Sequence, residues 1–211
     1  MQKRGRFLNQ KLIYENTIVI VALLSLSLFS SAQNTHFGLK GGLNLSTLDA
    51  DQGPDYDWKA GFHLGGLAHI HIIPHFNIQP GLVYSQQGAK DKNNGDAKFK
   101  LGYLNLPVLL QYMTGTGFRL QTGPQLGIAL SAKVKSGDVE YDVGDAVNDL
   151  DFSWLFGASY LSPGGLGIDA RYNHGITNIL EDNDVPELRN RVIQIGLFYQ
   201  FMHLTNTRKR K

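Results

Sequence analysis

Cysteine is absent from the 211-residue sequence. Its absence excludes a disulfide framework, a thiolate metal site and the lipid-modified N-terminal cysteine of a bacterial lipoprotein. The sequence also lacks an apolar run of the roughly 20 residues that a membrane-spanning helix needs. With 42% hydrophobic and 18% charged residues, the chain is too apolar for a disordered protein. These absences leave a folded chain without helical membrane spans.

The N-terminus has the pattern of a secretory signal peptide. Residues 1–16 are basic, an apolar run follows over 17–29, and small residues stand at 30–32. A basic start, an apolar centre of 7–15 residues and small residues before the cut define such a signal. We predict cleavage after Ala32; an uncleaved N-terminal anchor is the alternative. Because the mature chain from Gln33 leaves the cytoplasm, we expect no nucleic-acid binding.

The mature chain alternates apolar and polar residues with a period of two, which is typical of strands. The clearest case lies near the C-terminus, where Ile193, Ile195 and Leu197 alternate with Gln194 and Gly196. Eight such segments lie at about 36–45, 58–71, 76–85, 104–112, 119–130, 152–160, 166–173 and 191–201. The domain over 33–201 is therefore predicted to be all-β.

Short and long connections between these segments alternate strictly. Tight turns rich in Gly and Pro are predicted near 73–75, 114–117 and 162–165. Long polar loops are predicted at about 46–57, 88–98, 132–151 and 175–190. In an up-and-down barrel this alternation places every long loop on one rim. The pattern predicts an eight-stranded antiparallel up-and-down transmembrane β-barrel with short periplasmic turns and longer extracellular loops.

Acidic residues are concentrated in the predicted long loops. After Ala32, every acidic residue except Asp169 falls in or at the edge of a long loop, which predicts an acidic rim. Asp169 alternates with Ile168 and Ala170, so we expect it inside the barrel beside Arg171. A carboxylate on the lipid-facing band costs free energy, whereas a carboxylate in a solvated outer loop does not.

A soluble ligand-binding barrel is the main structural alternative, but it should be apolar inside and polar outside. Here the more apolar face of the strands holds the large aromatic and aliphatic residues. This pattern favours a barrel whose outer surface contacts lipid. The more polar face, predicted to be the interior, collects Lys40, Asn44, His63, Gln79, Asn105, Gln111, Arg119, Gln121, Gln125, Asp169, Arg171, Gln194 and Gln200.

Eight strands leave an interior just wide enough for side chains, whereas water channels come with sixteen or more strands. We therefore predict that Lys40, Arg119, Asp169 and Arg171 form a buried polar network lining the lumen, since charges placed there need partners.

Four segments carry a resemblance to a known family. In this order and combination they resemble the outer membrane protein β-barrel domain family, or porin family, of small Bacteroidetes-type outer-membrane barrels. The segments are 37–46 (FGLKGGLNLS), 78–88 (IQPGLVYSQQG), 103–112 (YLNLPVLLQY) and 122–127 (TGPQLG). The resemblance covers about 37–201 and implies integral outer-membrane location; it implies little about activity.

The chain departs from the usual end of such barrels. The last predicted strand finishes on the aromatic residues of Tyr199-Gln-Phe201, but ten residues follow it. The family's insertion signal is therefore internal here. We interpret the basic tail over 202–211 as a disordered periplasmic extension, with contact to an anionic partner as the lesser alternative.

Three histidines are candidate metal ligands. His69, His71 and His75 have a spacing that zinc or copper could accept, with the first two on the interior face. The acidic loops offer oxygen ligands for calcium, but none matches a helix-loop-helix calcium site. We expect no metal and no cofactor, because histidines are ordinary at a membrane interface and solvated acidic loops are ordinary at a rim.

Catalysis would need a nucleophile, a base and an acid brought together at the rim. Ser85, His174 and Asp151 are conceivable, but no G-x-S-x-G signature supports them. We expect no catalytic residues and no enzyme.

The predicted function is that of a monomeric outer-membrane barrel, a structural or interaction module that displays acidic extracellular loops. Its expected partners are outer-membrane lipid, lipopolysaccharide and an extracellular ligand. A narrow passive channel for ions or small solutes is the first alternative. A lipid-active outer-membrane enzyme is the lesser one.

Overall fold

The chain is described by a computed structural model. No helix in the described part of the chain is long and apolar enough to cross a membrane. The predicted signal peptide, its cleavage site and the basic tail lie outside this part. The structure describes residues 35–50, 55–92, 97–137, 139–180 and 187–201.

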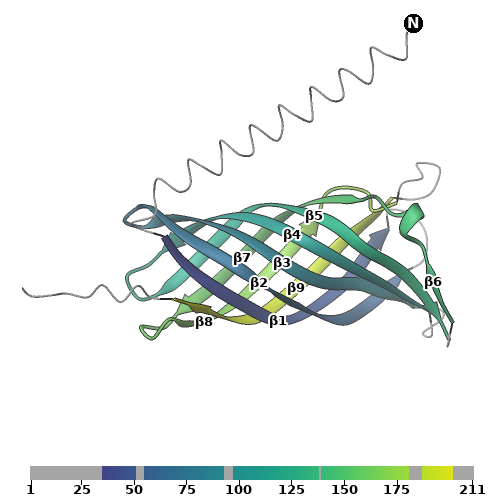
Figure 1. The fold of residues 1–211 in the computed structure, drawn as a ribbon, viewed down its shortest axis with the longest axis horizontal. Coiled ribbons are helices and arrows are strands. Elements are labelled where there is room, and N and C mark those ends of the chain that lie inside the picture. Colours follow the sequence, from purple (N-terminus) through teal and green to yellow (C-terminus); the bar gives the residue numbers. More distant parts are fainter. Residues whose placement is uncertain (1–34, 51–54, 93–96, 138, 181–186, 202–211) are drawn as a thin grey trace, which may run out of the picture. The chain divides into compact units, whose positions relative to one another are not determined.

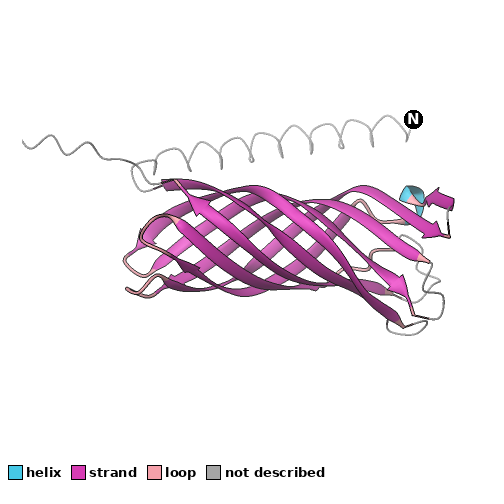
Figure 2. Cartoon of the chain, turned by 90° about the horizontal axis from the view of Figure 1, so that it is seen from below, coloured by secondary structure: helices cyan, strands magenta, loops and turns pink. Residues whose placement is uncertain are grey.

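Eight of the nine described strands close into an antiparallel barrel (Figures 1 and 2). The ring closes where β1 pairs with β9, in a register that runs from Gly38 opposite Gln200 to Ala50 opposite Leu188. This architecture confirms the predicted fold class. The barrel strands are β1 (Thr35–Ala50), β2 (Tyr56–Ile73), β3 (Phe76–Asp91), β4 (Lys98–Met113), β5 (Phe118–Ser136), β7 (Leu150–Leu161), β8 (Leu166–Gly175) and β9 (Leu188–Gln200).

The three predicted tight turns join β2 to β3, β4 to β5 and β7 to β8 at one end of the barrel. Gly117 and Gly165 have φ angles of 91° and 86°. Glycine adopts this left-handed conformation without a steric penalty, which explains its place in these turns. The amide of Gly165 donates to the carbonyl of Ser162 at 3.0 Å and closes the β7–β8 turn. We call this end the turn end, and the opposite end the loop end.

The loops in the structure are shorter than predicted, because several strands continue into the predicted loop segments. β1 runs to Ala50, β3 runs to Asp91 and β4 begins at Lys98. The segment predicted as a loop over 132–151 holds the end of β5, the added strand β6 (Val139–Asp142) and the 3-10 helix η2 (Gly144–Ala146). Beyond the apolar band the alternation of β4 and β5 reverses its direction: in residues 98–101 and 132–135 the apolar residues face the interior and the lysines face outward. The predicted strands stopped short because they followed only the outward-facing apolar residues.

The barrel is polar inside and apolar outside. The structure buries all thirteen side chains that the sequence assigned to the interior, each at most 6% exposed. The large aliphatic side chains on the other face of the strands are open, such as Leu43 at 70% and Leu197 at 57%. This polarity is the reverse of a soluble barrel and matches an outer wall in contact with lipid.

Aromatic side chains form a belt around the outer wall near the turn end. Such belts mark the membrane interface in transmembrane barrels, because an aromatic ring is amphipathic. Tyr199 and Phe201 pack edge to face in this belt, with ring centroids 5.5 Å apart. Its exposed members are Phe37, Phe76, Tyr112, Phe118, Tyr160, Tyr199 and Phe201.

Candidate functional site in the barrel lumen

The middle of the lumen holds an ion cluster that joins three strands. Asp169 of β8 lies 2.8 Å from the Nζ of Lys40 on β1 and 2.7 Å from the Nε of Arg171, all through its Oδ2 atom. The Nη2 of Arg171 donates to the Oε1 of Gln79 on β3 at 2.9 Å. Asp169 and Arg171 share a face of β8 because they are two residues apart. One carboxylate is thus shared by two buried cations.

Arg119, the fourth residue predicted for this network, lies apart from the other three. It is 3% exposed, and among the described residues the only hydrogen-bond partner of its side chain is Gln200, whose Oε1 accepts from Nη2 at 3.3 Å. The Nε and Nη1 atoms of Arg119 have no partner in the described part of the chain. The structure therefore brings Lys40, Asp169 and Arg171 together and leaves Arg119 outside the cluster.

A second network, centred on Asn44 of β1, was not singled out from the sequence. The Nδ2 of Asn44 donates to the Oγ of Ser85 and to the backbone oxygen of Gln86, at 3.0 and 2.9 Å. Its Oδ1 accepts from Gln194 at 3.2 Å and lies 2.8 Å from the Nδ1 of His63. This network links β1, β2, β3 and β9. The sequence could predict that these side chains point into the barrel. It could not predict which of them pair, because the partners are distant in sequence.

Glycine makes room for the His63 ring. A Cβ atom built on Gly196 would lie 3.0 Å from the His63 Nε2 and 2.7 Å from the backbone oxygen of Gly41. A larger residue at position 196 would have to displace backbone. This is a close approach of the kind that selects glycine within strands.

Two further charged residues face the interior and were missed. Asp151 was assigned to a loop, but it is 6% exposed and accepts hydrogen bonds from Asn190 at 2.8 Å and Thr177 at 2.9 Å. Lys59 is 7% exposed and donates to the backbone oxygen of Gln87. Asp151 alternates with Phe152, so the period of two could have indicated that its side chain points inward. The polar residues that precede it led to its assignment to a loop.

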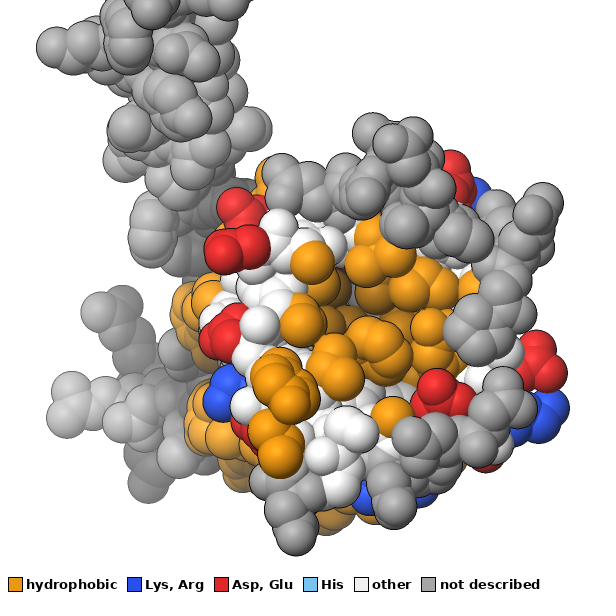
Figure 3. All heavy atoms as spheres, turned by 90° about the vertical axis from the view of Figure 1, so that its right-hand side faces the viewer, with side chains coloured by type: hydrophobic (Ala, Val, Ile, Leu, Met, Phe, Trp, Pro, Cys, Tyr) orange, Lys and Arg blue, Asp and Glu red, His pale blue; other side chains and the backbone are white. Residues whose placement is uncertain are grey.

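An apolar cluster covers the lumen at the loop end; we call it the apolar plug. In the end-on view of Figure 3, apolar side chains gather in the hollow at the centre of this end. Inward-facing residues of five barrel strands meet one residue from each of two connections. The plug consists of Leu48, Ala89, Leu101, Tyr103, Ala132, Val147, Ile179 and Leu188.

Hydrogen bonds between the two connections hold the plug in place. Val147 and Leu180 form an antiparallel β-bridge, and the amide of Asn148 donates to the oxygen of Ile179 at 2.9 Å. The Nδ2 of Asn148 donates to the backbone oxygens of Asn178 and Leu180, at 3.0 and 2.8 Å. The connection after η2 and the connection after β8 therefore behave as one layer above the lumen.

The histidines weighed as metal ligands do not form one group. His69 and His71 pack edge to face with ring centroids 4.9 Å apart, and His36 packs edge to face against His71 with ring centroids 5.5 Å apart. His75 is exposed, and its Nδ1 lies 3.2 Å from the oxygen of Met113. Within the described residues, no set of three or more His, Cys, Asp or Glu side chains could hold a metal ion.

The three residues weighed for a catalytic triad are separated. Ser85 and Asp151 face the lumen, where they bind Asn44 and Asn190 respectively. His174 is exposed on the other face of β8, 3.5 Å from the hydroxyl of Tyr172. A strand wall therefore lies between the candidate base and its candidate partners.

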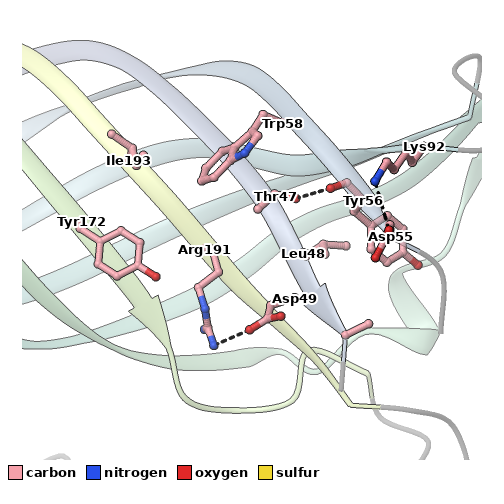
Figure 4. Close-up of a pocket in the computed structure, with 11 residues that line it drawn as sticks. Thr47, Leu48, Asp49, Asp55, Tyr56, Trp58, Lys92, Tyr172, Arg191 and Ile193 are labelled. Atoms are coloured by element: carbon pink, nitrogen blue, oxygen red, sulfur yellow. Dashed lines mark hydrogen bonds and ion pairs between the residues drawn. The ribbon is translucent and has the colours of Figure 1, made fainter. Parts of the chain in front are cut away.

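The outer wall at the loop end is hollowed over β8, β9, β1 and β2. The hollow has a volume of about 540 Å³, and Trp58, Tyr172 and Ile193 line it (Figure 4). Its charges are balanced, because Arg191 lies 2.8 Å from Asp49 and Lys92 lies 3.1 Å from Asp55. No binding role was predicted for this surface.

Comparison with known proteins agrees with this architecture. A family model described as "Outer membrane protein beta-barrel domain" matches residues 31–181. No curated protein matches the chain.

The fold agrees with that of a solved structure, Neisserial surface protein A. The chain is similar to Neisserial surface protein A, with a TM-score of 0.58 and 18% identity over 78% of this chain and 97% of that one. It is also similar to Ail, the attachment invasion locus protein of Yersinia pestis, with a TM-score of 0.49 and 13% identity over 80% and 99% of the two chains. For OprG from Pseudomonas aeruginosa the TM-score is 0.46 and the identity is 15%, over 80% and 96%.

Proposed function

Because the chain belongs to the outer membrane protein β-barrel domain family, we propose that this integral outer-membrane barrel is a closed, monomeric module that displays its loop end to the outside. Its role is structural or interaction-based. It is not a diffusion channel or an enzyme.

The apolar plug is the observation that carries this proposal. Tyr103, Leu101 and Ile179 are at most 3% exposed at the mouth of the lumen. A dry apolar layer opposes the passage of ions, because an ion that enters it loses its hydration without gaining partners. Below the plug, the Lys40–Asp169–Arg171 cluster occupies the middle of the lumen.

The outside of the loop end offers a surface for a partner. Val139, Tyr141, Leu150 and Ile176 are exposed there, between 47% and 58%. Two exposed acidic residues, Glu140 and Asp142, alternate with Val139 and Tyr141 on β6. Exposed apolar residues ringed by charges are typical of protein interaction sites. An extracellular ligand is therefore the expected partner of this end.

A narrow channel is the second candidate, and the turn end of the lumen favours it. There, buried polar atoms of His69, Asn77, Gln111, Gln121 and Arg119 have no hydrogen-bond partner in the described residues. Buried polar groups are paired in more than nine cases in ten, with protein or with water. If water fills the turn-end half of the lumen, an ion has to cross only the remaining, dry part of the lumen.

Planar-bilayer conductance separates the two candidates. The purified protein is reconstituted in a bilayer, with a sixteen-stranded porin as positive control and protein-free detergent as negative control. We expect no conductance steps above the detergent control. The variant Asp169→Asn serves as the matched probe, since asparagine is close in size to aspartate and its amide removes one negative charge from the lumen.

Conductance steps in the unaltered protein would contradict the closed module. If their size or ion selectivity also changed in Asp169→Asn, the lumen would be the conducting path and the channel would replace our proposal.

A further inference from the structure

Five lysines lie side by side on three neighbouring strands at the loop end; we call them the lysine patch. In the strand register, Lys98 of β4 is opposite both Lys90 of β3 and Lys135 of β5. Two residues further along β4, toward the middle of the barrel, Lys100 is opposite Lys133 of β5. Residues paired across antiparallel strands point to the same face, so these side chains share one surface.

The patch faces the outside of the wall. Ala89, Leu101 and Ala132 are at most 2% exposed and belong to the apolar plug inside. Successive residues of a strand point to opposite faces. Lys90, Lys100 and Lys133 adjoin these three plug residues and therefore point outward.

The positive charge of the patch is only partly neutralised. Glu140 of β6 lies 2.6 Å from the Nζ of Lys100 and 3.0 Å from that of Lys133. These hydrogen bonds lower the pKa of Glu140 to about 2. In the described part of the chain, the other three lysines form no ion pair within 4 Å. Asp57 and Asp142 also flank the patch, opposite Lys90 and Lys133, so five cations face three anions.

Two hydroxyl groups lie between the lysine patch and the apolar band of the wall. Gly102 of β4 stands two residues from Lys100 and two from Leu104 on the same face. A Cβ atom built on Gly102 would lie 2.6 Å from the Oγ of Ser131 and 3.3 Å from the hydroxyl of Tyr84. The missing side chain thus lets both hydroxyl groups close over the β4 backbone at Gly102.

The apolar band below continues along the same strand faces. Leu106, Val108 and Leu110 follow on β4, and Leu126 and Leu130 lie on β5, between 37% and 57% exposed. A lipid whose acyl chains pack on this band would place its headgroup at the hydroxyls and lysines. A cation cluster at the edge of a membrane attracts anionic headgroups, at about 1 kcal/mol per lysine.

We propose that the lysine patch, with Tyr84 and Ser131, binds the phosphate groups of an anionic glycolipid in the outer leaflet. The site takes a membrane lipid because its basic residues lie on the outer wall above the apolar band. This inference stands independently of whether the lumen conducts.

The hollow on the wall of β8, β9, β1 and β2 provides an internal contrast. Its cations Arg191 and Lys92 are each paired with an aspartate. That wall therefore has no comparable excess of positive charge. One of these paired cations, Lys92, serves as a control position at the same end of the barrel.

Binding is tested on the full protein in neutral detergent. Phosphorylated lipid A is the probe, its dephosphorylated form is the lipid control, and bound lipid is counted by native mass spectrometry. We expect the unaltered protein to bind the phosphorylated form. The triple variant Lys90→Gln/Lys98→Gln/Lys135→Gln should bind about 100-fold more weakly, since each lysine contributes roughly fivefold.

A matched variant controls for the general loss of charge. Lys92→Gln/Arg189→Gln removes two cations that are already paired with Asp55 and Glu187. We expect its binding to change by less than about threefold, in line with the small contribution of exposed ion pairs. Heat-modifiability on gels, the shift from a compact to an unfolded band, checks that each variant is folded.

Three results would overturn the proposal. The folded triple variant could bind like the unaltered protein. The dephosphorylated lipid could bind as tightly as the phosphorylated one. Inorganic phosphate or a soluble anionic polysaccharide, at equal phosphate or sulfate concentration, could displace the lipid completely, and the site would then take a soluble anion.

Discussion

Arg171 and Arg119 are buried guanidinium groups in the same lumen, but their surroundings differ. Arg171 lies 2.7 Å from the carboxylate of Asp169 and donates to Gln79 at 2.9 Å. Arg119 lies toward the turn end, and the one hydrogen-bond partner of its side chain among the described residues is the neutral Gln200 at 3.3 Å. A buried charge is stabilised by its partners and not by burial itself. The middle of the lumen should therefore contribute more to stability than the turn end.

Removing the shared carboxylate should have the largest effect. We expect Asp169→Asn to lower the free energy of unfolding by about 3–5 kcal/mol, because Lys40 and Arg171 would keep buried charges without a counter-charge. Urea unfolding in lipid vesicles, followed by tryptophan fluorescence, measures this. The double variant Lys40→Gln/Asp169→Asn removes one cation as well and should recover part of the loss. Unchanged stability in Asp169→Asn would break the comparison.

Removing the paired arginine should have a smaller effect. We expect Arg171→Met to lower the free energy of unfolding by about 1–3 kcal/mol, because the Oε1 of Gln79 loses its donor. Lys40 would still neutralise Asp169, from 2.8 Å away. The same urea titration measures this change. A loss as large as that of Asp169→Asn would mean that Lys40 cannot hold the carboxylate alone.

The same substitution at the unpaired arginine should have the smallest effect. We expect Arg119→Met to change the free energy of unfolding by less than about 1 kcal/mol in either direction, because an apolar side chain of similar length can replace a weakly partnered buried charge. Parallel titrations of Arg119→Met and Arg171→Met sharpen the comparison. Equal losses in both variants would show that Arg119 has stronger interactions than its hydrogen bonds indicate.

Much of the fold could be predicted from the sequence. The alternation of Ile193, Gln194 and Ile195 identifies a strand and its two faces, because the side-chain period of a strand is two. The tight turns were predictable from glycine, since Gly117 and Gly165 take left-handed angles. The strand ends were missed because β4 and β5 continue as segments whose lysines face outward and whose apolar residues face inward, the reverse of the apolar band.

Less of the candidate site could be predicted. The inward direction of Asp169 and Arg119 followed from alternation, but their different partners did not. Lys40 and Asp169 are 129 residues apart, and Gln79 and Arg171 are 92 apart. The apolar plug was also missed, because Val147 and Ile179 look like isolated apolar residues in polar segments.

By itself the sequence determined the strands, their inner and outer faces and the alternation of turns with loops, because each depends on residues that are neighbours along one strand. Only the tertiary structure decided which charges share a carboxylate, that two connections fold over the mouth, and that five lysines from three strands form one patch. These features depend on strand register and ring closure, which set the height of each residue along the barrel. A shift of one strand would leave its own pattern intact and change every one of these contacts.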